Sequence, residues 1–145
     1  MKASPMTAEL SISIGQFSDK GRKENNQDCH GAFIPQDSLL ALKGIVVAMA
    51  DGISSSQTSH IASQTAVRTF IDDYYCTSEA WSVKNSFERV LAAINSWLYS
   101  QTMAGDGRYE KDKGYVSTFS ALIFKNRSAH IFHVGDTRIY RLNPN

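Results

Sequence analysis

The sequence has few cysteines, no long apolar run and no excess of charge of either sign. Its two cysteines, Cys29 and Cys76, are too few for a disulfide framework and lack the spacing of a metal site, so we read them as reduced thiols. The longest apolar run, Ile45 to Ala50, is far too short to span a bilayer. The first ten residues contain no apolar core of a signal peptide. We therefore expect a cytoplasmic protein.

The charge balance also excludes whole classes of partner. Fifteen basic residues stand against fourteen acidic ones, a formal net charge of +1. Such a chain has no general attraction for nucleic acid or anionic lipid, so we expect no nucleic-acid partner and no membrane partner. A length of 145 residues with 42% hydrophobic residues suits one domain with a core of its own.

Several familiar catalytic motifs are missing. The sequence contains neither the Gly-x-x-x-x-Gly-Lys loop nor the Gly-x-Gly-x-x-Gly fingerprint of nucleotide-binding proteins. No Gly-x-Ser-x-Gly elbow surrounds the serines at 54–56, which we expect to cap a helix instead. His130 and His133 are three residues apart on a predicted strand, so they should point to opposite faces and not share a metal.

Hydrophobic periodicity predicts strands, then helices, then strands. Leu10, Ile12 and Ile14 alternate with serines, as in a half-buried strand, and the continuously apolar run 45–50 is typical of a strand covered on both faces. We expect further strands at 29–34, 116–124, 129–134 and 138–142, helices around 62–74 and 87–101, and a mobile loop after residue 104. The last three strands should form an antiparallel meander through turns at 125–128 and 135–137. Segregated strands and helices indicate an α+β fold.

Three aspartates fall at the ends of predicted strands: Asp28, Asp51 and Asp136. A strand end holds a carboxylate still while leaving it wet, and oxygen ligands suit Mg²⁺ or Mn²⁺ rather than zinc. Asp51 is followed by Gly52, which lets a backbone carbonyl approach an ion without a Cβ in the way. Each aspartate also has a plain structural alternative, because Asp-Gly and Gly-Asp pairs are common in turns.

The basic pair Arg22 and Lys23 precedes Asp28 in a very polar stretch, 18–28, that must lie on the surface or in a cleft. Either side chain could bind a phosphate dianion, arginine in a bidentate manner. The alternative is a solvated loop with no ligand. From these residues alone, without a wider motif, the solvated loop is the favoured interpretation.

Taken in order, the motifs resemble those of metal-dependent protein phosphatases of the PP2C class. The matching pieces are Ser18 to Asp28, Val46 to Gly52, Ser117-Thr118 and His133 to Arg138, and the match runs from about residue 10 to the end. We accordingly expect residues 1–9 to be a tail and 10–145 to be the N-terminal part of a phosphatase domain. The resemblance implies an α/β/β/α sandwich of antiparallel sheets with flanking helices, truncated at its C-terminus. It is closest to the phosphatase half of bacterial phosphatase–kinase fusion proteins.

The resemblance also implies roles for individual residues. Asp51 would bridge two divalent cations, Mg²⁺ or Mn²⁺, and Gly52 would offer its carbonyl to one of them. Asp28 would hold metal-bound water, and Asp136 would lie near a third, weaker metal position. Arg22 or Lys23 would contact the substrate phosphate. Metal-bound hydroxide would attack a phosphoserine or phosphothreonine of a protein substrate directly.

Two departures from the family pattern bear on activity. Where some members have a histidine after Asp-Gly, this sequence has Ile53, so metal-bound water would protonate the leaving group. Members of the family also carry a further Asp-Gly and an Asp-Asn motif that complete the metal site, and this sequence contains neither after Asp136. We therefore expect weak cation binding. Exposed sheet edges should favour self-association.

Three hypotheses follow from these features. The chain is a protein serine/threonine phosphatase, or a catalytically inactive binding or regulatory module with the same fold, or a fragment of a larger protein that includes a kinase domain. Comparing the chain with a version extended through the absent motifs, using Mn²⁺ and a phosphopeptide, would separate them.

Overall fold

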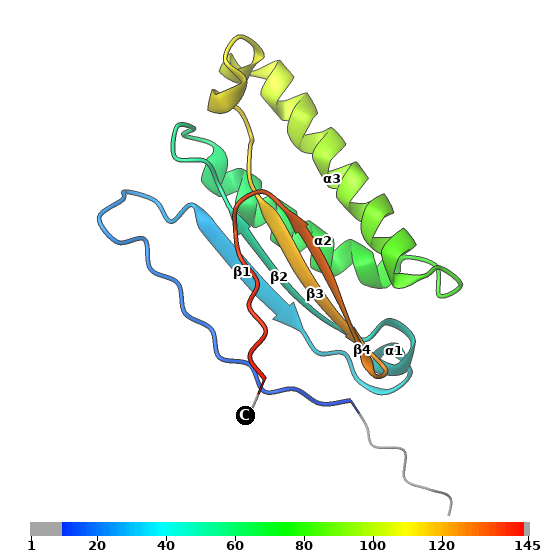
Figure 1. The fold of residues 1–145 in the computed structure, drawn as a ribbon. Coiled ribbons are helices and arrows are strands. Elements are labelled where there is room, and N and C mark those ends of the chain that lie inside the picture. Colours follow the sequence, from blue (N-terminus) through cyan, green and yellow to red (C-terminus); the bar gives the residue numbers. More distant parts are fainter. Residues whose placement is uncertain (1–9, 144–145) are drawn as a thin grey trace, which may run out of the picture.

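The computed structural model describes residues 10–143 and consists of an antiparallel sheet with helices packed against it (Figure 1). The sheet order follows the chain: β1 (Asp28–Phe33), β2 (Ile45–Asp51), β3 (Phe119–Lys125) and β4 (Ser128–Val134). The helical elements are α1 (Asp37–Lys43), α2 (Ser59–Cys76), α3 (Val83–Ala104) and the short 3₁₀ turns η1 (Asp106–Arg108) and η2 (Lys111–Lys113). The predicted α+β class is confirmed.

Strand β2 lies inside the sheet, as its unbroken apolar sequence predicts. It pairs with β1 on one side and with β3 on the other. Val46, Ala48 and Ala50 point toward the helices and are buried. Because successive side chains of a strand alternate between faces, Val47, Met49 and Asp51 point to the other face of the sheet.

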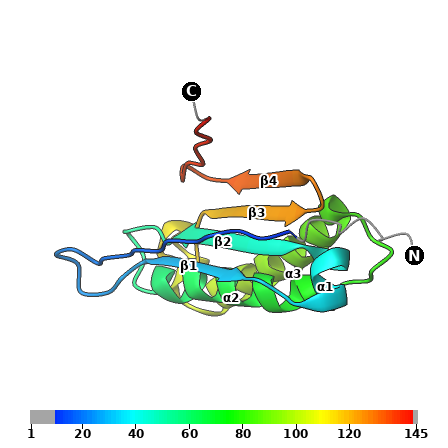
Figure 2. The same ribbon diagram turned by 90° about the horizontal axis from the view of Figure 1, so that it is seen from below.

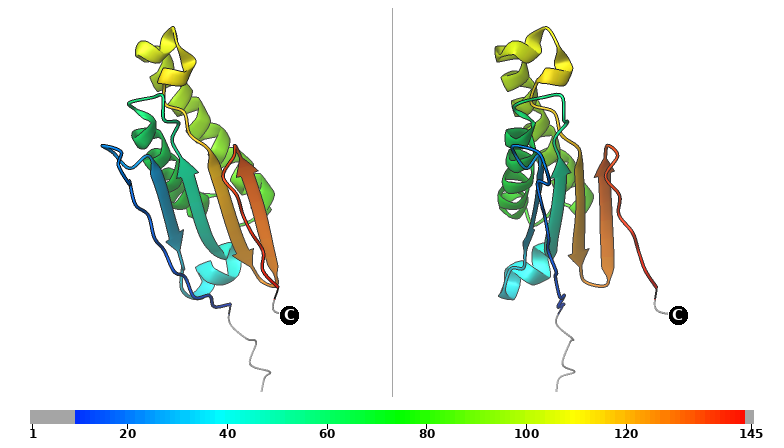
Figure 3. Two further views of the ribbon diagram at one scale, coloured as in Figure 1. Left: turned by 60° about the vertical axis from the view of Figure 1, so that its left-hand side comes forward. Right: turned by 90° about the vertical axis from the view of Figure 1, so that its left-hand side faces the viewer.

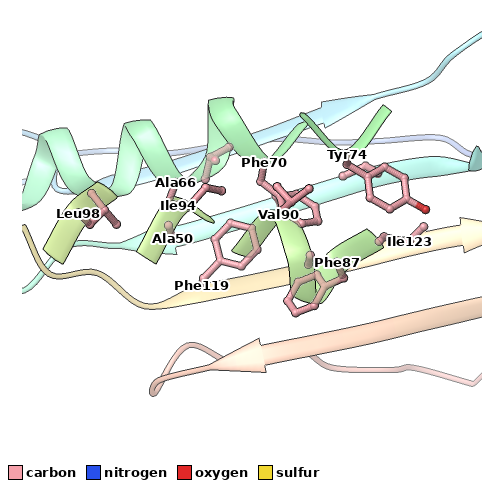
Figure 4. Packing of buried hydrophobic residues seen from close by; sticks show 14 of the residues in the cluster. Ala50, Ala66, Phe70, Tyr74, Phe87, Val90, Ile94, Leu98, Phe119 and Ile123 are labelled. Atoms are coloured by element: carbon pink, nitrogen blue, oxygen red, sulfur yellow. The ribbon is translucent and has the colours of Figure 1, made fainter. Parts of the chain in front are cut away.

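The core lies between the sheet and the helices α2 and α3, and aromatic rings dominate it (Figure 4). The ring centroid of Phe70, on α2, lies 5.0 Å from that of Phe119 and 5.4 Å from that of Phe87. Phe87 also stacks on Phe132 of β4 at 3.9 Å. These four phenylalanines join both long helices to the two C-terminal strands.

The two long helices match their predicted periodicity, but their N-termini differ. The Ser82 side chain caps α3 by accepting a hydrogen bond from the backbone N–H of Asn85 at 3.1 Å. The predicted capping of α2 by residues 54–56 is wrong, because the cap residue is Thr58 and its own side chain makes no capping bond; the Ser56 hydroxyl only accepts from the Thr58 N–H, at 3.1 Å. The Ser56 hydroxyl donates instead to the Gly114 carbonyl at 2.7 Å, which fastens the loop after η2. Among residues 10–143, no helix is both long and apolar enough to cross a membrane.

Two short elements were absent from the expectations. Helix α1 connects β1 to β2 and has seven residues, of which Leu40 and Lys43 are buried. Two turns are too few for a periodic pattern to show in the sequence. The region expected to be a mobile loop holds η1 and η2, whose Gly107 packs against Gly114.

Two predicted strands are wrong. Residues 10–14 and 138–142 have no strand assignment, and β3 begins at Phe119 rather than at residue 116. In the first segment Leu10, Ile12 and Ile14 are nevertheless half-buried while the serines between them are exposed. The alternation of apolar and polar residues therefore indicates an extended chain with one side partly buried and the other side exposed. A strand also needs a hydrogen-bonded partner, and the described part of the chain supplies none for these segments.

The two faces of the sheet are covered differently. Figure 2 shows α2 and α3 on one side and the segments before β1 and after β4 on the other. Both views in Figure 3 agree with this arrangement. We call the side away from the helices the open face. Met49 on this face keeps 40% of its surface exposed, and Ile131 keeps 56%.

Candidate active site

Asp28 and Asp51 lie directly opposite each other at one end of the sheet. Asp28 is the first residue of β1 and Asp51 is the last residue of β2, and the antiparallel register pairs their Cα atoms. Both side chains belong to the open face, where the carboxyl groups come within hydrogen-bonding reach of each other. Strand pairing thus brings together two aspartates that are separated by 22 intervening residues.

The environment of Asp51 disfavours its negative charge. Burial raises the pKa of the Asp51 carboxyl above its ordinary value of 3.8. The hydrogen bond with Asp28 and the charge of that neighbour raise the pKa further, Asp136 adds to the effect, and Lys23 opposes it. The site is therefore a small region of concentrated negative charge with one opposing lysine.

Gly52 is required by packing at the end of β2. Its N–H donates to the Gln27 carbonyl at 3.0 Å, which continues the β1–β2 pairing by one residue. A Cβ added here would overlap the carbonyl oxygen of Ser59, in the first turn of α2. The Gln27 amide in turn donates to the Ser59 hydroxyl at 3.0 Å. The strand end is thus held against the start of α2 by contacts that only glycine permits.

Ser117 and Thr118 hold the backbone of Asp51 from the other side. The Thr118 N–H donates to the Asp51 carbonyl at 2.8 Å, and the Asp51 N–H donates to the Thr118 hydroxyl at 2.9 Å. The Ser117 hydroxyl also donates to the Asp51 carbonyl at 3.1 Å. Sequence reasoning marked this pair as a motif but gave neither residue a role. The signal was two adjacent hydroxyl residues at the start of a strand.

Asp136 occupies the turn that follows β4. The turn begins at Gly135, whose φ of +108° favours glycine, and its third residue, Thr137, bonds to the Ser120 hydroxyl at 2.6 Å. Asp136 itself is exposed and close enough for its charge to raise the pKa of Asp51. The third predicted aspartate therefore lies near the first two.

The two basic candidates are placed differently. The Lys23 amine donates to the Gln27 side-chain oxygen at 2.7 Å and to the Ser54 hydroxyl at 3.2 Å, and its charge acts on Asp51. Arg22 is exposed and makes no side-chain hydrogen bond or ion pair with any of residues 10–143. The fold thus brings Lys23, but not Arg22, to the aspartates.

We call Asp28, Asp51 and Asp136 the acidic cluster. A polar groove of about 600 Å³ lies beside it. Lys23 borders it, and its other walls come from the loop before β1 and from the start of α2, namely Glu24, Asn25, Gln27, Ser54, Ser55, Ser56, Gln57 and His60. The groove is adjacent to the aspartates and does not contain them.

The donor set suits a hard cation but supplies few ligands. Asp28 and Asp51 offer carboxylate oxygens of the kind that Mg²⁺ and Mn²⁺ prefer. Across residues 10–143, no group of three or more histidine, cysteine, aspartate or glutamate side chains is arranged to hold a metal ion. The opposed carboxylates therefore fit a weakly held divalent cation that keeps most of its water.

Comparisons with known proteins give the family. The chain is 30% identical over 141 residues to a curated protein of Streptococcus pyogenes serotype M6 (strain ATCC BAA-946 / MGAS10394) whose name assigns it to the protein phosphatase 2C type. That match covers 92% of this chain and 49% of the relative, so the chain spans about half the relative's length. No solved structure matches. The family model described as protein phosphatase 2C matches residues 18–144, and the chain therefore belongs to the protein phosphatase 2C family.

Proposed function

We propose that the chain forms part of the site of a metal-dependent phosphatase that hydrolyses phosphoserine or phosphothreonine on proteins. The observation that carries this proposal is that strand register places Asp28 directly opposite Asp51, on the open face at one end of the sheet. Family membership supports protein phosphatase activity in general. Metal dependence is inferred from the carboxylate oxygens of the aspartates, and the phosphoserine or phosphothreonine substrate is inferred from the family resemblance.

In this proposal the aspartates would bind divalent cations next to the position of the phosphate monoester. Burial raises the pKa of Asp51, and the charges of Asp28 and Asp136 add to this effect, so the ionised Asp51 carboxyl is disfavoured in the absence of a cation. A divalent ion would offset this effect. When bound, such ions supply an ionised water nucleophile near neutral pH and neutralise charge on the transferring phosphoryl group.

Lys23 is our candidate for the phosphate contact. Its amine lies beside the cluster, held by Gln27 and Ser54, and could donate to a phosphate oxygen. The neighbouring polar groove would then accept the peptide that flanks the phosphorylated residue. Arg22, which is not brought to the site, would be dispensable.

Phosphopeptide hydrolysis tests this function. The chain, and a version extended through the absent Asp-Gly and Asp-Asn motifs, would be assayed with Mn²⁺, each with and without Asp51→Asn. We expect activity in the extended chain, its loss in Asp51→Asn, and retention in Asp72→Asn, a control on the exposed side of α2. Activity that survives Asp51→Asn, or silence of the extended wild type, would contradict the proposal.

One observation favours the second hypothesis, an inactive binding module. The described residues bring only two carboxylates directly together, which is few for a catalytic metal centre. In that case the chain would bind Mn²⁺ and a phosphopeptide weakly without turnover, and calorimetry would detect the binding while the assay stayed silent. A kinase-domain partner, suggested by the family resemblance, stays a prediction.

A further inference from the structure

Thr118 forms hydrogen bonds with both backbone polar groups of Asp51, the N–H and the carbonyl. Its N–H donates to the Asp51 carbonyl at 2.8 Å, and its hydroxyl accepts from the Asp51 N–H at 2.9 Å. One residue thereby satisfies both backbone polar groups of the aspartate at the end of β2. With both groups bonded, the backbone at Asp51 has little freedom to change its φ and ψ angles, so the Asp51 Cβ keeps its direction on the open face.

The same residue also contacts the turn that carries Asp136. A Cβ built on Gly135 would lie 2.6 Å from the Thr118 methyl carbon and 2.7 Å from its Cβ. Real Cβ atoms do not approach so closely, so the backbone of Gly135 rests directly against the threonine side chain. The next residue along the chain is Asp136.

A second attachment holds the far side of this turn. The hydroxyls of Thr137 and Ser120 bond at 2.6 Å, and the Ser120 hydroxyl also bonds to Nδ1 of His133 at 2.8 Å. Ser120 pairs with Met49 on the open face but is only 3% exposed, so this bond is shielded from water. Asp136 is therefore flanked by two anchored neighbours, Gly135 on Thr118 and Thr137 on Ser120.

We propose that Thr118 is a positioning residue: it fixes Asp51 opposite Asp28, where a cation would bind, and it holds the turn that carries Asp136 nearby. This inference rests on the proposed function, and it adds a role for a residue that touches neither substrate nor ion. Threonine suits this role because the role requires a hydroxyl and a methyl group on the same side chain. The hydroxyl holds Asp51, and the methyl packs on Gly135.

Two substitutions separate these groups. Thr118→Val keeps the branched shape against Gly135 and removes the acceptor for the Asp51 N–H. Thr118→Ser keeps that acceptor and removes the methyl. If Thr118 acts by positioning Asp51, serine should preserve the site better than valine does, although valine is the closer match in shape.

The first measurement needs no metal: amide hydrogen exchange of the ¹⁵N-labelled chain, followed at Asp51 by NMR. Loss of one hydrogen bond of about 1 kcal/mol should speed exchange of the Asp51 amide roughly five- to tenfold in Thr118→Val. In Thr118→Ser the rate should stay within about twofold of wild type. Ser117→Ala, which removes a bond to the Asp51 carbonyl and leaves the Asp51 N–H bonded, should fall between them. Equal rates in Thr118→Val and wild type would overturn the proposal.

The second measurement is Mn²⁺ titration of the same samples, read as paramagnetic broadening near Asp28, Asp51 and Asp136. We expect Thr118→Val to need roughly tenfold more Mn²⁺ than wild type for equal broadening. Thr118→Ser should fall between the two, because it keeps the bond to Asp51 and loses only the methyl contact with Gly135. A melting curve of each variant shows that it is folded at the temperature used. If Thr118→Ser is impaired as much as Thr118→Val while both are folded, the threonine acts through packing and the proposal is wrong.

The two measurements distinguish failure of the proposed function from failure of the role assigned to Thr118. A wild-type chain that gives no Mn²⁺ broadening at any of the three aspartates contradicts the proposed function and, with it, the cation part of this inference. The exchange rate at Asp51 still decides whether Thr118 fixes that residue. Faster exchange in Thr118→Val beside an unchanged Mn²⁺ response would mean that Thr118 orders the backbone without serving the cation, which also overturns the proposal.

Discussion

The two faces of the four-stranded sheet have opposite properties, although the same strands supply both. On the helix side, β2 contributes Val46, Ala48 and Ala50 to a closely packed aromatic core. On the open face it contributes Met49, partly exposed, and Asp51, whose charge is opposed by its neighbours. The register of a single strand therefore places stability on one side and unsatisfied charge on the other.

This difference indicates where the free energy of folding comes from. Burial of apolar side chains on the helix side stabilises the chain, because each buried phenylalanine contributes about 2–3 kcal/mol relative to an exposed one. The ionised Asp51 carboxyl opposes folding, first because it is partly buried and then because Asp28 and Asp136 carry like charge. Apolar burial on the helix side offsets this cost.

The largest test of this comparison is a matched pair of truncations. Phe70→Ala removes a fully buried ring from the helix side, and we expect it to lower the free energy of unfolding by about 3–5 kcal/mol. Met49→Ala, on the open face of β2, should cost less than about 1 kcal/mol. Urea denaturation of both variants measures the difference. Similar losses would show that something covers the open face in solution.

A smaller effect is expected at the start of α3. Ser82→Ala removes the side chain that accepts the Asn85 N–H, and the loss of such a cap costs about 1 kcal/mol. Ser82→Asp keeps an acceptor and should restore stability. If both variants unfold like wild type in urea, local capping does not limit the stability of the helix layer.

The open face should respond to pH in the opposite sense from an ordinary paired carboxylate. The pKa of Asp51 is higher in the folded chain than its ordinary value of 3.8, so the folded state binds the proton more tightly than the unfolded state does. This contribution to stability is present at acid pH and is lost as the pH rises through the folded pKa. Asp51→Asn should therefore melt above wild type at pH 7, and the difference should shrink as the pH falls toward 4.

The control for this pH series is Asp72→Asn, which removes an exposed carboxylate of α2. Its melting temperature should follow that of wild type at every pH. An Asp51→Asn variant less stable than wild type at pH 7 would show that Asp51 is stabilised by its surroundings, contrary to the direction of its pKa shift.

The smallest effect concerns association through the sheet. The outer edge of β4 has no partner strand among residues 10–143, and Ile131 on that strand is 56% exposed. We expect weak, concentration-dependent self-association, reduced by Ile131→Lys. Analytical ultracentrifugation over a range of concentrations measures it. A wild type that sediments as a monomer throughout would contradict the expectation.

Much of the difference between the two faces of the sheet could be predicted from the sequence, because the spacing of apolar residues indicates which side chains are buried. The apolar run of β2 and the spacing of Phe87, Val90 and Ile94 gave the interior strand and α3. Asp28 and Asp51 were singled out because they stand at strand ends, but their direct opposition in the β1–β2 register was not predicted. Local patterns suffice where the packing partner is simply a hydrophobic core.

The errors have a common physical cause, which is that pairing depends on a second segment. The alternation of Leu10, Ile12 and Ile14 correctly indicated a two-sided environment, but it carries no information about a hydrogen-bonded neighbour. The role of Thr118 was missed for the same reason, since its partner Asp51 is 67 residues away. The preference for Lys23 over Arg22 likewise depended on where Ser54 lies in space.

The separation of Thr118 from Asp51 has a consequence for the order of events when the chain is made. Asp28 and Asp51 can meet as soon as the β1–β2 pair forms, while the contacts to Thr118 must wait for both long helices to be synthesised and for a loop of 67 residues to close. Ribosome-bound chains halted before β3 would therefore hold two of the three aspartates together without the clamp on Asp51. The acidic cluster should gain its final geometry late, as one of the last parts of this chain to mature.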